Sequence, residues 1–127
     1  MDSMELMRVW TDEVWNAGNY DRVADCLGET YLRHDQLGNR AVTRDQATAQ
    51  IQGLRDRVQD LHFWVDDFTV APNRIWVRWR MTGTSAESGE PVIRSGLQVY
   101  RVTDGRLAET WAAGAPDGDD WTAPLIP

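Results

Sequence analysis

The hydrophobic residues near the start of the chain recur with the period of a helix. Met7, Trp10, Val14 and Ala17 follow 3–4–3 spacing, which places them in one apolar stripe. The segment NAGN that follows is expected to end this helix, because glycine suits the left-handed conformation found just after a helix. The pattern therefore predicts an amphipathic helix at the start of the domain.

Two further helices are expected before residue 60. The segment YDRVADCL (20–27) predicts a short helix that Asn19 can cap. Thr43 and Gln46 have the spacing of a capping box, which marks the start of a third helix. Its apolar positions follow 4–3–4 spacing: Ala47, Ile51, Leu54 and Val58. We therefore expect the first half of the chain to be helical.

The second half changes to the period of a strand. Four strands are predicted, over 61–71, 73–84, 91–102 and 106–115, with TDGR as the turn before the last of them. Alternation is strongest in the second strand, where one face carries Ile75, Val77, Trp79 and Met81. Short connections between successive strands favour an antiparallel meander.

Helices followed by strands predict an α+β fold in which the helices pack on one face of the sheet. The 127 residues form a single predicted domain, 1–127, with an irregular tail from about residue 115. Asp66 and Asp67 interrupt the first strand, which indicates a bulge or a sheet edge.

Charge and composition narrow the possible partners. The net charge is −7 and no run of basic residues occurs, which argues against binding to nucleic acid or to anionic membrane. The single cysteine, Cys26, fits a cytoplasmic protein, and its apolar spacing predicts a buried side chain. Two histidines in unrelated segments and one cysteine give no metal-ligand spacing, so we expect no metal site.

Three segments carry a resemblance to a known family: VWNAGNYDRVADCLGETYLRHDQLG, NRIWVRWRMTGT and GLQVYRVTDGRLAETW. In this order and spacing they resemble the NTF2-like superfamily, and within it the SnoaL-like polyketide cyclases, over residues 5–115. The resemblance implies a cone, in which a curved antiparallel sheet wraps around N-terminal helices and leaves an apolar pocket. Members of the superfamily close polyketide rings, isomerise ketosteroids, dehydrate, or open epoxides, without a metal.

The resemblance also raises a difficulty about catalysis. Ala112 stands where the cyclases carry the aspartate that acts as general acid and base. The arginine and aspartate of epoxide-opening relatives fall on Trp79 and Met81, so we do not expect epoxide opening. Asp35 matches the aspartate base of the ketosteroid isomerase pattern, and His34 is its neighbour.

Asp35 and His34 are the candidate catalytic residues, because a carboxylate or an imidazole can take a proton from a carbon beside a carbonyl. In an extended segment the two side chains point to opposite sides, so only one would face the pocket. A solvated turn is the alternative reading of this pair. The candidate substrate-binding residues are Trp15, Trp79, Met81, Gln98, Tyr100 and Ala112, with Gln98 and Tyr100 binding a substrate oxygen.

Two functions remain open from the sequence. The first is a cofactor-independent cyclase or isomerase acting on a small hydrophobic or aromatic natural-product intermediate of polyketide type. The second is a non-catalytic ligand-binding or scaffold module, which the loss of the aspartate at Ala112 favours. In either case Trp76, Arg78 and Arg80, on the outward face of their strand, predict a homodimer formed through the sheet.

Overall fold

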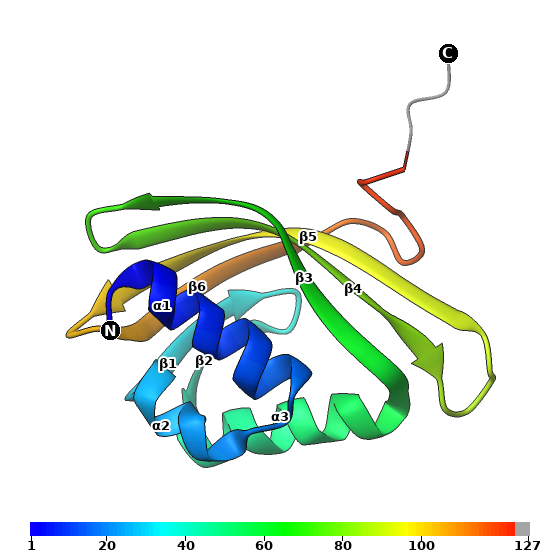
Figure 1. Cartoon of the computed structure of the whole chain (residues 1–127), viewed down its shortest axis with the longest axis horizontal. Helices are drawn as coiled ribbons and strands as arrows, with labels where there is room; N and C mark the ends of the chain where they lie inside the picture. The colour runs from blue at the N-terminus through cyan, green and yellow to red at the C-terminus, as the bar shows by residue number, and fades with distance from the viewer. Residues whose placement is uncertain (124–127) are drawn as a thin grey trace.

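The computed structural model describes residues 1–123 and arranges them as helices beside one sheet (Figure 1). The helical elements are α1 (Ser3–Arg8), the π-helix η1 (Val9–Asn16), the 3₁₀ turn η2 (Tyr20–Arg22), α2 (Val23–Cys26) and α3 (Arg44–Arg57). The strands are β1 (Leu27–Asp35), β2 (Gly38–Thr43), β3 (Val58–Ala71), β4 (Arg74–Ser85), β5 (Pro91–Thr103) and β6 (Arg106–Gly114). None of these helices is long and apolar enough to cross a membrane.

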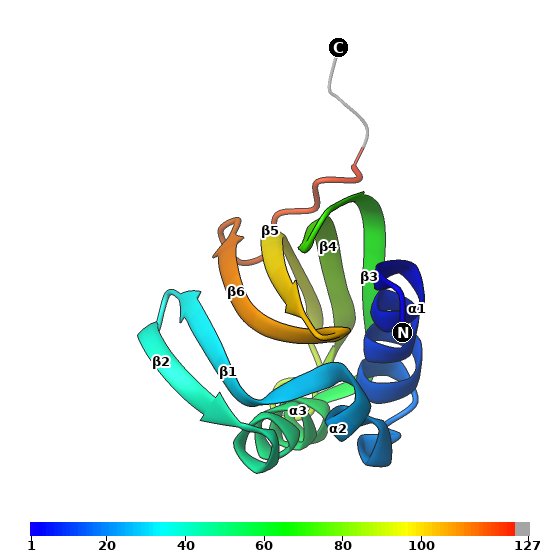
Figure 2. The ribbon, with the colours of Figure 1, turned by 90° about the vertical axis from the view of Figure 1, so that its left-hand side faces the viewer.

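The six strands form one curved, unclosed sheet in the order β2-β1-β6-β5-β4-β3. Strands β3 to β6 make the expected antiparallel meander, and β1 joins it by pairing parallel to β6. Figure 2 shows the sheet arching over α3, with α1 beside β3. The predicted α+β cone is confirmed.

The expectation of a helical first half is wrong for residues 27–43, which form the β1–β2 hairpin. Three inward positions of β1 are Tyr31, Arg33 and Asp35, so its inner face is largely polar. A strand whose charged residues point inward lacks the alternation of apolar and polar residues that reveals strands in a sequence. The turn lies at residues 36–37, between β1 and β2, so His34 and Asp35 end a strand and are not themselves a turn.

The third predicted helix is confirmed as α3, with its capping box in place. The Thr43 hydroxyl accepts a hydrogen bond from the Gln46 backbone N–H, and the Gln46 side chain accepts one from the Thr43 N–H. The C-terminal end of η1 is bound to α3, because the Arg55 guanidinium donates a hydrogen bond to the carbonyl oxygen of Asn16. The Arg55 contact therefore fixes α3 relative to the end of η1.

The core lies between the helices and the sheet, and a second apolar cluster surrounds Met81 at the far end of β4. Trp15, Val65 and Trp79 are half-buried and pack against both clusters, so they line the boundary between them. Cys26 is fully buried, as expected, and burial raises the pKa of its thiol to about 12. The strand β3 lies at an edge of the sheet and its pairing shifts between Val65 and Asp67, which confirms the bulge.

Candidate functional site

A cavity of about 390 Å³ opens between the concave face of the sheet and the helices. A pocket of this volume lies within the range of small-molecule sites. Seven of the eight candidate residues line it: Trp15, Asp35, Trp79, Met81, Gln98, Tyr100 and Ala112. They come from η1, β1, β4, β5 and β6, so the fold brings together residues far apart in the chain.

Four aromatic rings form one wall of this cavity. Trp15 lies edge-on to Trp10, with ring centroids 6.4 Å apart. Phe63 stacks on both Trp15, at 5.3 Å, and Trp79, at 5.5 Å, with interplanar angles of 26° and 20°. Offset stacking of this kind is favourable beyond the area that it buries, so the wall is a rigid apolar surface.

Two local features hold this aromatic wall in place. The π-helical geometry of η1 brings residues five apart, such as Trp10 and Trp15, to the same side of the helix. The Asn16 side chain then bridges to β3, because its Nδ2 donates to the Phe63 carbonyl at 2.9 Å and its Oδ1 accepts from the Phe63 N–H at 2.7 Å. The end of η1 and the middle of β3 are thereby fixed relative to each other.

Gly96 on β5 makes room for the Trp79 ring. The two residues are directly paired across β4 and β5. A Cβ atom at position 96 would lie 2.4 Å from Cζ2 of Trp79 and 2.7 Å from the carbonyl oxygen of Ala113. Only glycine at this position therefore allows the Trp79 indole to lie against β5 and form part of the cavity wall.

We expect Gly96→Ala to displace Trp79 and to destabilise the fold by about 1–3 kcal/mol, the usual effect of overpacking. Gly114→Ala is the matched control, because Gly114 pairs with Gly96 across β5 and β6 and a Cβ there meets no atom closer than 3.7 Å. Urea denaturation followed by tryptophan fluorescence measures both variants. Equal stability of the two variants would contradict the role assigned to Gly96.

Asp35 is held as a carboxylate at the cavity wall. Arg40 donates to Oδ1 at 2.7 Å and to Oδ2 at 3.1 Å, and the Leu37 N–H donates to Oδ1 at 2.9 Å. Arg33 forms an ion pair with Oδ2 at 3.2 Å. The hydrogen bonds from Arg40 are the main reason that the pKa of Asp35 lies below its ordinary value, so the group is ionised at neutral pH.

The pKa values of two phenols in the same cavity are raised, whereas that of Asp35 is lowered. Tyr31 and Tyr100 are buried, which raises the pKa of Tyr100 to about 12 and that of Tyr31 well above 10. Both therefore stay protonated and can donate a hydrogen bond to a ligand oxygen. Gln98 lies beside them on β5, and its Nε2 donates to the Thr110 hydroxyl at 2.8 Å.

His34 lies on the opposite, outer face of the sheet. Its imidazole stacks on Trp111 at 5.3 Å, and its Nε2 lies 2.7 Å from a carboxylate oxygen of Glu109. Its Nδ1 lies 2.7 Å from Oδ1 of Asn39. Hydrogen bonds that the ring donates to the Asn39 amide oxygen and then to the Glu109 carboxylate raise the pKa of His34, and both ring nitrogens are engaged outside the cavity. The structure thus separates the two members of the pair.

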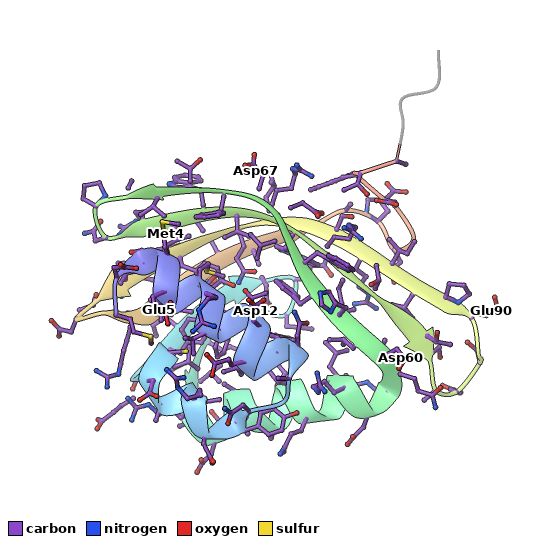
Figure 3. The ribbon with its side chains drawn as sticks, in the orientation of Figure 1. Met4, Glu5, Asp12, Asp60, Asp67 and Glu90 are labelled. Carbon is purple, nitrogen blue, oxygen red and sulfur yellow. The ribbon has the colours of Figure 1, made fainter. Side chains whose placement is uncertain are left out.

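The outer face carries a shallow groove of about 690 Å³ next to His34. Trp76, Val99 and Trp111 are neighbours across β4, β5 and β6 and form its floor. Asp67, labelled in Figure 3 above the sheet, lies at its margin. Three candidate residues line this groove as well as the inner cavity: Asp35, Gln98 and Ala112. The groove lacks the buried phenols, so we place the candidate site inside the cone.

Several residues of the cavity were not found from the sequence: Trp10, Tyr31, Arg33, Leu54, Phe63 and Ser95. Tyr31 and Arg33 lie four and two positions before Asp35. Alternate residues of a strand share one face, so predicting a strand here would have placed both on the same face as Asp35. Nothing in the sequence indicated Trp10 as a cavity residue. Within residues 1–123, no three side chains of His, Cys, Asp or Glu are arranged to hold a metal ion.

Comparison with known proteins agrees with this architecture. A putative polyketide cyclase from Acidithiobacillus ferrooxidans is 22% identical, with a TM-score of 0.78 over 88% of this chain and 87% of that one. IdmH, a putative polyketide cyclase from Streptomyces antibioticus, is 17% identical, with a TM-score of 0.79 over 90% and 92%. A Catenulispora acidiphila protein with a ketosteroid isomerase-like fold, solved with trimethylamine, is 14% identical, with a TM-score of 0.71 over 86% and 84%.

Sequence comparison gives the family directly. No curated protein matches the chain. The family model for the SnoaL-like domain matches residues 8–110, which include most of the cavity wall. The chain therefore belongs to the SnoaL-like domain family.

Proposed function

We propose that this protein is a cofactor-independent cyclase or isomerase that acts on a small aromatic or hydrophobic natural-product intermediate, of polyketide type. One observation carries the proposal: the same cavity holds an ionised carboxylate, Asp35, and two protonated phenols, Tyr31 and Tyr100. Titratable groups whose pKa values are pushed apart in one site are the usual basis for assigning acid and base roles.

The proposed reaction begins with proton transfer. The Asp35 carboxylate takes a proton from a carbon next to a substrate carbonyl, and the electron pair of that C–H bond moves onto the carbonyl oxygen to form an enolate. Tyr31 and Tyr100 stabilise this oxygen by donating hydrogen bonds. In an aldol closure the enolate carbon attacks a second carbonyl, whose π electrons move onto its oxygen, and the protonated Asp35 gives its proton to the alkoxide that forms. In an isomerisation Asp35 instead returns the proton to another carbon of the enolate.

A non-catalytic ligand-binding module is the second candidate, and two observations favour it. Ala112 lines the cavity and carries no group that can move a proton. The pairing of Asp35 with Arg40 and Arg33 lowers its basicity, since a carboxylate stabilised in its charged form binds a proton less readily. In this alternative the same cavity would bind the aromatic ligand without changing it.

Deuterium exchange of a model ketone separates the two candidates. The α-protons of 2-tetralone, a bicyclic aromatic ketone, exchange with D₂O through an enolate and can be followed by ¹H NMR. We expect the protein to accelerate this exchange by at least about 100-fold over an equal concentration of acetate, as is typical of a positioned base. An exchange rate no higher than that with acetate, together with measurable binding of the ketone, would refute the enzymatic function and support the ligand-binding module.

We also propose a homodimer formed through the outer face of the sheet. Trp76 and Leu97 are each 54% exposed there and Trp111 is 38% exposed, which leaves a large apolar surface uncovered in the monomer. Arg78 lines the same groove. Arg80 is less available to a partner, because it is paired with Asp66 and lies 4.6 Å over the Trp64 ring.

Light scattering coupled to gel filtration tests the dimer. We expect the protein to run as a dimer at about 100 µM and Leu97→Glu to run as a monomer, because a buried unpaired charge opposes association. Met4→Glu is the control, since Met4 is 64% exposed and lies on α1, away from this face. A monomeric parent protein, or a dimer that survives Leu97→Glu, would contradict the proposal.

On the basis of its single cysteine we further propose a cytoplasmic location.

A further inference from the structure

The cavity described above also has an electrostatic preference. We propose that it selects an aromatic ligand bearing an anionic oxygen group, a carboxylate or the enolate of a 1,3-dicarbonyl, and that Arg33 and Trp79 bind this group. The inference deepens the proposed function, because it names the substrate class of the same site.

The charges around the cavity favour an anion. Three arginines line it, Arg33, Arg57 and Arg94, against two carboxylates, Asp35 and Asp117, and Arg94 is paired with Asp117 at 3.5 Å. The whole chain, by contrast, carries a net charge of −7. Arg57 and Arg94 are exposed, whereas Arg33 is half-buried. The excess of one positive charge around the cavity of an acidic protein favours a negatively charged group there.

Arg33 retains binding capacity after its protein contacts are counted. Its Nη1 donates to Oε1 of Gln50 at 3.0 Å, and its Nη2 pairs with Asp35 at 3.2 Å. Asp35 does not fully neutralise it, because that carboxylate also accepts two hydrogen bonds from Arg40. The Nε–H of Arg33 is buried and has no hydrogen-bond partner within residues 1–123.

Trp79 supplies a second unpartnered donor. Its side chain lies on the cavity floor, and its Nε1–H is buried with no acceptor in the described part of the chain. A buried donor left without a partner is energetically unfavourable, because it has lost its hydrogen bond to water. A small rotation of either side chain that brings its N–H onto an anionic oxygen would recover this energy, and hydrogen bonds to a charged acceptor are the strong ones.

The aromatic part of the ligand follows from the wall next to these donors. Trp15, Phe63 and Trp79 form a continuous stack along one side of the cavity. A flat aromatic frame lying against this stack would direct a substituent toward Trp79 and Arg33. A neutral hydrocarbon would fill the same volume but would leave both N–H groups unpaired.

Calorimetric titration at about pH 7.5 with two probes tests the inference. 2-Naphthoate is ionised at this pH, and methyl 2-naphthoate is its neutral counterpart with the same rings. We expect the acid to bind at least about 10-fold more tightly than the ester, the effect of one hydrogen bond to a charged group. We expect Arg33→Gln and Trp79→Phe each to reduce this preference, the ratio of the affinities for acid and ester, severalfold.

Matched variants on the outer face serve as controls. Trp76→Phe makes the same change as Trp79→Phe, and Arg101→Gln removes a guanidinium that is paired with Glu109 outside the cavity. Both are expected to keep the full preference for the acid. Equal affinity for acid and ester, failure of the acid to bind, or loss of preference in the controls would overturn the inference. This experiment measures binding and not catalysis. A protein that does not accelerate ketone exchange would therefore refute the enzymatic function, but it could still prefer the acid to the ester.

Discussion

Asp35→Asn is expected to slow the protein-catalysed exchange of ketone α-protons by about 10²- to 10⁴-fold, the usual contribution of a general base. Asparagine has the shape of aspartate but cannot accept a proton. The change also leaves Arg33 and Arg40 without their carboxylate, so circular dichroism must show that the variant is folded. His34→Ala is the control, and we expect it to retain the parent rate because His34 lies on the outer face. A large loss in His34→Ala and none in Asp35→Asn would reverse the assignment.

The dependence of the rate on pH distinguishes the same two residues independently. Hydrogen bonding lowers the pKa of Asp35 below 3.8, so a reaction that uses it as base keeps its rate as the pH falls from about 8 to about 5. The pKa of His34 is raised above 6.5, so a reaction that uses it as base loses rate as the pH falls through the neutral range. A flat profile over this interval is therefore expected.

Leu107→Ala is expected to destabilise the fold by about 2–5 kcal/mol, as is usual when a buried leucine is truncated. Leu107 is fully buried in the core and stands where β6 pairs with both β1 and β5, at Leu27 and Val102. Strand β6 is the only strand in the described sheet that connects the β1–β2 hairpin to the meander. A cavity at this junction would weaken the attachment of the hairpin that carries Asp35.

Leu37→Ala provides the comparison for Leu107→Ala. Leu37 is 79% exposed in the turn after β1, so its truncation is expected to change stability by no more than about 0.5 kcal/mol. Urea denaturation followed by circular dichroism gives both values. Similar stabilities for the two variants would show that the junction at β6 contributes less than the burial of Leu107 indicates.

The elements that depend on local signals could be predicted from the sequence. The alternation of Ile75, Val77, Trp79 and Met81 gave the second strand of the meander and the face of it that turns inward. The capping box at Thr43 and Gln46 gave the start of α3. Each of these features arises from residues within one turn or one strand, which is the range over which sequence patterns act.

The hairpin and the rest of the site depend on contacts that no local pattern contains. Strand β1 pairs parallel to β6, about eighty residues further along the chain, and its inward charges are stabilised by Arg40 and Gln50. The inner face of β1 therefore resembles a solvated surface in the sequence. Likewise, Trp10 faces the cavity together with Trp15 because η1 is a π-helix. In an α-helix, two residues five positions apart would lie on different sides of the helix.

The side-chain indole N–H signals of the seven tryptophans offer the most direct test of where the ligand binds. A ¹H–¹⁵N spectrum recorded during titration with 2-naphthoate reports on both faces of the sheet at once. Trp10, Trp15 and Trp79 line the inner cavity, and Trp76 and Trp111 line the outer groove. We expect the Trp79 and Trp15 signals to move, and the Trp76 and Trp111 signals to stay in place. Movement of Trp76 and Trp111 with Trp79 and Trp15 unchanged would show that the ligand binds outside the cone, which would contradict the account.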